Sequence, residues 1–152
     1  GTNSTHNLVL ALRAGARLGI GVEPDCRYYH QALLVRQCLG LHDRVHIVRN
    51  IDEAKTVCFY EGTQWGDNAR SKCIGLLCAV LRHVPESERV PTLERMGRLC
   101  CRILINGNGL SDAPDGDNAE SILRYIRQTS LQVEELRSEP HVRGLRMLVR
   151  AP

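Results

Sequence analysis

The sequence predicts an α/β fold in which a mostly parallel sheet lies between layers of helices. Helix-like and strand-like segments alternate along most of the 152 residues, which is the pattern of such folds. Two β-like runs with a short link between them close the chain, so we expect an antiparallel pair at one edge of the sheet. Hydrophobic residues make up 43% of the chain and charged residues 24%, enough for the packed core of one domain over residues 1–152.

The first half of the chain predicts two helices and three strands. Ser4 or Thr5 can cap the first helix, and Asp25 can cap the second, which Gly40 ends. The strand runs are short and apolar or β-branched. The predicted elements are helix 5–14, strand 17–23, helix 25–39, strand 44–49 and strand 56–60, with a loop over 61–66.

The second half predicts three helices and three strands. Apolar residues at helical spacing after Asp67 or Asn68 indicate the first of these helices. Glycine and aspartate residues mark a long loop. The predicted elements are helix 67–82, helix 87–98, strand 100–105, loop 107–118, helix 118–128 and strands 131–137 and 144–150.

One expected element is absent. Open sheets of this kind place a central strand and a glycine-rich turn before the first helix, whereas this chain starts at Gly1. An upstream segment supplies that strand, or another chain supplies it, or the fold prediction is wrong.

Composition and charge limit the compartments and partners expected for the protein. No apolar run approaches the roughly 20 residues that cross a bilayer, and no signal peptide opens the chain, so we expect no membrane partner. Seven cysteines without a C-x-x-C pair favour a reduced intracellular compartment, cytoplasmic or nuclear, and no metal site. A net charge of +3 permits a nucleic-acid partner without indicating one.

Polar residues follow the predicted strands where ligands of such sheets bind. Glu23 ends the strand 17–23, where a carboxylate can accept hydrogen bonds from both hydroxyls of a ribose; the alternative is an exposed residue at the start of the next helix. Asn50, Ile51 and Asp52 follow the strand 44–49 and could hold an adenine, unless they form an ordinary turn.

Residues 60–65 follow the predicted strand 56–60. They place an acid, an amide and the only tryptophan at the mouth of the sheet, where loops position substrates. The alternative is that Trp65 covers the edge of the core.

The segments 1–4 and 19–25 resemble the end of the first motif and the whole second motif of class I S-adenosylmethionine-dependent methyltransferases. The closing pair of strands resembles that family's last hairpin. The resemblance implies a Rossmann-like sheet and S-adenosylmethionine as cofactor. The cofactor-binding residues it implies are Gly1, Thr2 and Asn3 near the methionine, Glu23 at the ribose, Asn50, Ile51 and Asp52 around the adenine, and Gly21.

The same resemblance places the substrate-facing fourth motif at residues 60–64. If the chain is active, we expect Glu61 to orient or deprotonate the nucleophile, with Tyr60 and Trp65 beside the methyl-transfer channel and Thr63 and Gln64 facing the substrate. The motif is not the Asn/Asp-Pro-Pro-Tyr/Phe of enzymes that methylate nucleobase amines. The short link between the predicted strands 44–49 and 56–60 is similar to that of histone-lysine methyltransferases without a SET domain, so we expect a macromolecular substrate, protein or RNA.

Two other functions remain open. The incomplete first motif and the unusual fourth motif fit a catalytically inactive, methyltransferase-like subunit that acts as a scaffold. A nicotinamide-dependent oxidoreductase also carries an acid after its second strand, but it needs G-x-G-x-x-G before the first helix. The sequence upstream of Gly1 would separate these hypotheses.

Overall fold

The computed structural model describes residues 5–63, 72–78, 80–107, 114–139 and 144–152. The chain forms two compact units, Gly1–Asp67 and Asn68–Pro152. The expectation of one domain over residues 1–152 stays a prediction.

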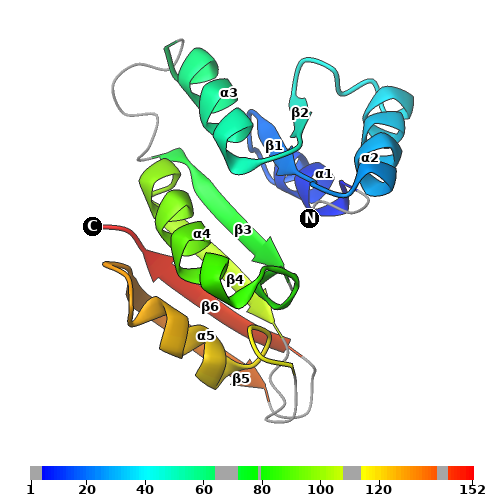
Figure 1. Ribbon diagram of the computed structural model, residues 1–152. Helices are drawn as coiled ribbons and strands as arrows, with labels where there is room; N and C mark the ends of the chain where they lie inside the picture. The colour runs from blue at the N-terminus through cyan, green and yellow to red at the C-terminus, as the bar shows by residue number, and fades with distance from the viewer. Residues whose placement is uncertain (1–4, 64–71, 79, 108–113, 140–143) are drawn as a thin grey trace. The chain divides into compact units, whose positions relative to one another are not determined.

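The first unit is a two-stranded parallel sheet flanked by helices (Figure 1). Val45 and Ile47 alternate along one strand, so both side chains point to the face that also buries Leu12 and Ala32 of two helices. The third helix lies on the other side of the strands from α2 (Figure 1). The elements are α1 (His6–Arg13), β1 (Gly19–Val22), α2 (Cys26–Cys38), β2 (Val45–Val48) and α3 (Ile51–Thr63).

Of the predicted helix caps Thr5 and Asp25, the structure confirms only Asp25. The Asp25 carboxylate accepts hydrogen bonds from the backbone N–H groups of Arg27 at 2.9 Å and Tyr28 at 3.2 Å, so this cap is confirmed. Thr5 precedes α1 with a positive φ of 59° and makes no capping hydrogen bond through its side chain. The prediction for Thr5 is therefore wrong, because the left-handed backbone does not bring the hydroxyl to the helix amides.

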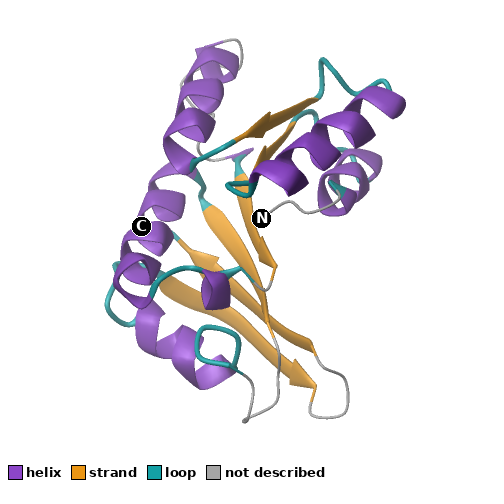
Figure 2. Ribbon diagram, turned by 45° about the vertical axis from the view of Figure 1, so that its right-hand side comes forward, coloured by secondary structure: helices purple, strands orange, loops and turns teal. Residues whose placement is uncertain are grey.

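The second unit is a four-stranded mixed sheet with α-helices on one face (Figure 2). The strand order is β3-β4-β6-β5, in which β3 and β4 are parallel and the other neighbours antiparallel. The closing antiparallel pair is thus confirmed. The elements are β3 (Ile74–Cys78), the 3-10 helix η2 (Leu81–His83), α4 (Glu86–Leu99), β4 (Arg102–Gly107), α5 (Ala119–Ile126), β5 (Gln132–Glu139) and β6 (Gly144–Arg150).

Both helices of the second unit pack on one face of its sheet. Inward-facing residues alternate along β4 and β6 and meet the apolar faces of α4 and α5. The largest buried side chains of this core are Leu81, Leu93, Ile103, Ile105, Ile122, Met147 and Val149.

The prediction of a strand over 56–60 is wrong, because α3 continues through these residues to Thr63. The β-branched and aromatic residues there have strand propensity, but propensity is a weak guide when a helix has already begun at a cap. The loop expected over 61–66 is wrong for residues 61–63, which belong to the same helix.

The prediction of a helix over 67–82 is wrong for residues 74–78, although Leu81 and Arg82 belong to the 3-10 helix η2. Residues Ile74–Cys78 form β3, and pairing with β4 buries Gly75 and Leu77 on alternate positions. Short apolar runs fit a strand and a buried helix equally well, so only the tertiary pairing decides. The link from β2 to β3 consequently contains a helix. It is not the short link on which the similarity to histone-lysine methyltransferases rested.

No helix within the described ranges combines the length and the apolar character that crossing a bilayer requires.

Candidate functional site

The carboxyl ends of β1 and β2 lie side by side in the first unit. Val22 pairs with Val48 in parallel register, and the next residue, Glu23, donates its backbone N–H to the Val48 carbonyl at 2.9 Å. Glu23 is only 4% exposed, and carboxylates are rarely so deeply buried. Its Oε1 accepts a hydrogen bond from the backbone N–H of Asp25 at 3.2 Å. The alternative of an exposed Glu23 is therefore wrong.

Arg49 ties the two strand ends together. Its guanidinium donates to the carbonyl of Pro24 at 2.9 Å, and its Cζ lies 5.2 Å from the centroid of the Tyr29 ring. This side chain starts at the end of β2 and reaches the segment that follows β1. The geometry holds the backbone around Glu23 in a fixed position relative to the end of β2.

Asn50 caps α3. Its Oδ1 accepts from the backbone N–H of Glu53 at 2.9 Å, and its Nδ2 donates to Glu53 Oε1 at 2.7 Å. Glu53 Oε2 in turn accepts from the backbone N–H of Arg49 at 2.8 Å. This is a reciprocal cap of the type that fixes helix starts. The local role of Asn50 is structural, and its predicted contact with an adenine stays a prediction.

The other predicted cofactor residues have clear places where the structure describes them. Gly21 is buried within β1 and pairs with Ile47, while Ile51 and Asp52 open α3, half-buried and exposed respectively. Five predicted site residues lie outside the described ranges: Gly1, Thr2, Asn3, Gln64 and Trp65.

Tyr60, Glu61 and Thr63 do not follow a strand. They belong to the last part of α3. The strand that takes the place of the predicted strand 56–60 is β3. The roles expected for them in catalysis and substrate binding rested on a position after a strand. Because that position is wrong, we do not propose those roles.

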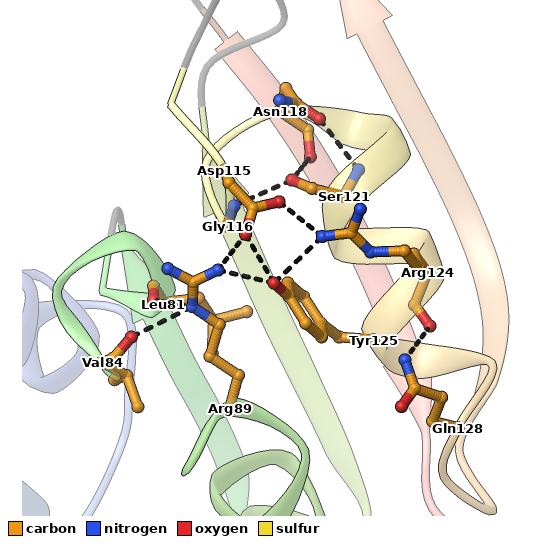
Figure 3. Close-up of polar contacts among 10 residues, drawn as sticks. All are labelled: Leu81, Val84, Arg89, Asp115, Gly116, Asn118, Ser121, Arg124, Tyr125 and Gln128. Carbon is orange, nitrogen blue, oxygen red and sulfur yellow. Dashed lines mark hydrogen bonds and ion pairs between the residues drawn. The ribbon is translucent and has the colours of Figure 1, made fainter. Parts of the chain in front are cut away.

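In the second unit, Arg89 joins the segment after β3 to the segment after β4 (Figure 3). Its Nε donates to the carbonyls of Leu81 and Val84, at 3.0 Å each, in the turn that precedes α4. Its Nη1 donates to the Tyr125 hydroxyl at 2.6 Å and contacts the carboxylate of Asp115. The side chain is 9% exposed, so these contacts satisfy a nearly buried charge.

The carboxylate of Asp115 accepts hydrogen bonds from three side chains, those of Arg89, Arg124 and Tyr125 (Figure 3). The Tyr125 hydroxyl donates to its Oδ2 at 2.5 Å, and Arg124 donates to its Oδ1 at 2.7 Å. The Tyr125 hydrogen bond lowers the pKa of Asp115 most, burial opposes it, and Arg89 and Arg124 lower the pKa further, so that the pKa lies below its ordinary value. Burial disfavours the charge of Arg89, but its hydrogen bonds to Tyr125 and Asp115 raise its pKa above the ordinary value.

A second ion pair lies beside the first. Arg82 in η2 contacts the buried carboxylate of Asp117 at 3.2 Å and donates through Nε to Nε2 of the exposed His83 at 3.0 Å. A guanidinium can only donate, so Nε2 of His83 is the acceptor in this contact. In this geometry the Nε2 lone pair is occupied, and the part of Arg82 that remains exposed offers hydrogen-bond donors.

The charged residues at the carboxyl ends of β3 and β4 form a charged edge of the second unit, and sequence reasoning missed all of them. They are Arg82, Arg89, Asp115, Asp117 and Arg124. The partners of Arg89 and Arg82 lie 26 and 35 residues further along the chain, so no local spacing links them. The only available signal was the group of three aspartates in the loop over 107–118. Chemically, this edge can order two loops at the carboxyl ends of β3 and β4 and offer donors to an oxygen-bearing substrate.

Comparison with known proteins identifies the fold. No protein-family model and no curated protein matches the sequence. Among solved structures, the mitomycin 7-O-methyltransferase MmcR superposes with a TM-score of 0.71 at 17% identity, covering 100% of this chain and 47% of MmcR. The N-terminal domain of EvdMO1 with SAH bound gives 0.63 at 15%, covering 100% and 72%. The magnesium protoporphyrin IX methyltransferase ChlM from Synechocystis PCC 6803 with bound SAM gives 0.63 at 13%, covering 98% and 66%.

These similarities show that the chain has the Rossmann-like α/β fold of class I methyltransferases, as the sequence predicted. The chain spans about half the length of MmcR.

Proposed function

We propose that this chain is the cofactor-binding part of an S-adenosylmethionine-dependent methyltransferase, with Glu23 as the ribose ligand. The observation that carries the proposal is a buried carboxylate directly after β1, beside the end of β2. Open α/β sheets bind nucleotides outside the carboxyl ends of their strands, and an acid there can accept from the ribose hydroxyls. Two of the similar structures contain SAH or SAM according to their descriptions.

The chemistry asks little of the protein beyond alignment. The sulfonium of the cofactor activates the methyl group, and the enzyme has to place a nucleophile in line with it. In the first unit, Glu23 would hold the ribose while Arg49 fixes the backbone around it.

A protein or RNA substrate is the less supported choice, because the short link that suggested it is not present. The names of two similar structures specify a mitomycin and a magnesium porphyrin, so we propose a small organic molecule as the substrate class. Methyl transfer from labelled S-adenosylmethionine into small-molecule and macromolecular fractions of an extract would separate the two.

Binding of S-adenosylhomocysteine by calorimetry tests the cofactor site. The 152-residue chain and a form extended upstream are both titrated, with NADH as the comparison ligand. Glu23→Gln should weaken binding by about 10-fold or more, because a charged hydrogen-bond acceptor contributes roughly 1.5–3 kcal/mol.

The matched control is Asp43→Asn, which makes the same change of charge at an exposed position before β2, at the opposite end of the strand. It should leave the affinity unchanged. If neither form binds S-adenosylhomocysteine although both are folded, the proposal fails and a scaffold function is favoured; binding of NADH alone would favour an oxidoreductase.

A further inference from the structure

Three cysteines meet at the amino ends of β3 and β4, in the second unit. The Sγ atoms of Cys73 and Cys100 lie 3.2 Å apart, and no disulfide joins them. The third, Cys101, donates from its Sγ to the backbone carbonyl of Cys73 at 3.2 Å. The Cys101 thiol thus donates to a backbone oxygen, whereas the sulfur atoms of Cys73 and Cys100 contact each other.

The backbone holds this pair in place from both sides. Cys100 follows α4 and donates its N–H to the Met96 carbonyl at 2.9 Å. Cys73 precedes β3, and its carbonyl accepts the N–H of Cys101 at 3.1 Å in the β3–β4 pairing. A Cβ added at Gly75 would lie 3.4 Å from the Cys100 sulfur, an ordinary van der Waals distance, so the thiol packs directly against β3.

We propose that Cys73 and Cys100 form a redox-active pair that closes to a disulfide under an oxidising thiol–disulfide balance. Cys100 is 4% exposed, whereas Cys73 is only half-buried, so Cys73 is the sulfur that an oxidant reaches first. The proposal does not depend on the proposed function.

The reaction balances with oxidised glutathione as the oxidant. The Cys73 thiolate attacks one sulfur of glutathione disulfide, forming a mixed disulfide and releasing one glutathione thiolate. The Cys100 sulfur then attacks the Cys73 sulfur and expels the second glutathione. The two protein thiols lose two electrons and two protons, and one glutathione disulfide becomes two molecules of glutathione.

Oxidation would act at the amino ends of the strands, whereas Arg82 and Arg89 lie in the segments that follow β3. The new bond would close the loop that contains β3 and α4, which restricts the unfolded chain and raises the unfolding temperature. Oxidation should therefore stabilise the second unit and leave its charged edge intact.

The test is to incubate the chain with oxidised glutathione, alkylate the remaining thiols and map the cross-links by mass spectrometry after trypsin. Peptides 73–82 and 99–102 each contain two cysteines, so fragment spectra and variants have to identify the pair. We expect one intramolecular cross-link, which survives in Cys78→Ser and Cys101→Ser and is lost in Cys73→Ser and Cys100→Ser. Reduction should reverse both the cross-link and the rise in unfolding temperature.

The exposed Cys26 and Cys38 of α2 are internal controls and should acquire only glutathione. The wild-type map requires no variant to fold, so the test does not depend on the stability of Cys100→Ser. Complete alkylation of both Cys73 and Cys100 after oxidation would overturn the proposal, as would a cross-link from Cys73 to Cys101.

Discussion

Replacing Arg89 by methionine keeps an apolar stem of similar length and removes the donors that join the segments after β3 and β4. The Leu81 carbonyl keeps a partner, because it also accepts the backbone N–H of Val84 at 3.1 Å. The carboxylate of Asp115 is 44% exposed, so its lost pairing is largely screened by water. The variant therefore loses stability mainly through two changes: the Val84 carbonyl loses its hydrogen bond from Arg89, and the Tyr125 hydroxyl loses a donor and must reorient. Together these should lower the free energy of unfolding by about 2–3 kcal/mol.

Arg95→Met is the matched control, because the same substitution on the same helix removes only an exposed ion pair with Glu88. Such pairs contribute roughly 0–1 kcal/mol. Urea unfolding followed by circular dichroism gives both free energies, and hydrogen exchange at the Gly116 amide, which donates to Ser121 Oγ at 2.9 Å, reports on the loop after β4. Equal losses of stability in the two variants, with unchanged exchange at Gly116, would refute the argument.

Three further predictions concern local contacts. Gly107→Ala should lower the free energy of unfolding, measured by thermal unfolding, by about 1–3 kcal/mol, because its Cβ would overlap a backbone carbonyl. Gly75→Ala should lower it by less than about 1 kcal/mol, because its Cβ meets a movable methionine methyl at 2.6 Å. Equal losses in the two variants would contradict this. The pKa of Asp115 is lowered on folding, so its contribution to stability is present above about pH 4 and is lost as the pH falls through the lowered value. Tyr125→Phe removes the largest cause of that shift, and its urea stability should fall less steeply in acid than that of wild type; parallel curves would contradict the assignment. Asp25→Ala should lower the free energy of unfolding of the first unit by about 1 kcal/mol through the lost cap, and an unchanged urea midpoint would count against it.

The sequence was informative where local chemistry decides the structure. Asp25 could be recognised as a cap because its carboxylate needs only the amides two and three residues later. The place of Glu23 between a strand and a helix could be predicted, because the end of a strand and the start of a helix are both local signals. Its burial could not be predicted, since it depends on the packing around the strand ends.

One error concerns a local signal, and the others arise where distant residues decide. The residues 56–60 have strand propensity, but the local cap formed by Asn50 and Glu53 begins a helix that continues through them. Residues 74–78 fit a helical spacing until β4 pairs with them. The cluster around Arg89 was invisible for the same reason, because its acidic partner lies in a loop after another strand.

The central claim is that the Glu23 carboxylate accepts from the ribose of the cofactor. A thermodynamic cycle tests it most directly, by titrating S-adenosylhomocysteine and its 2′-deoxy analogue into wild type and Glu23→Gln. We predict that the deoxy analogue binds wild type about 10-fold more weakly than S-adenosylhomocysteine and that the two ligands bind the variant almost equally, a coupling of at least about 1 kcal/mol. Independent, additive losses from the two changes would contradict the assignment of Glu23.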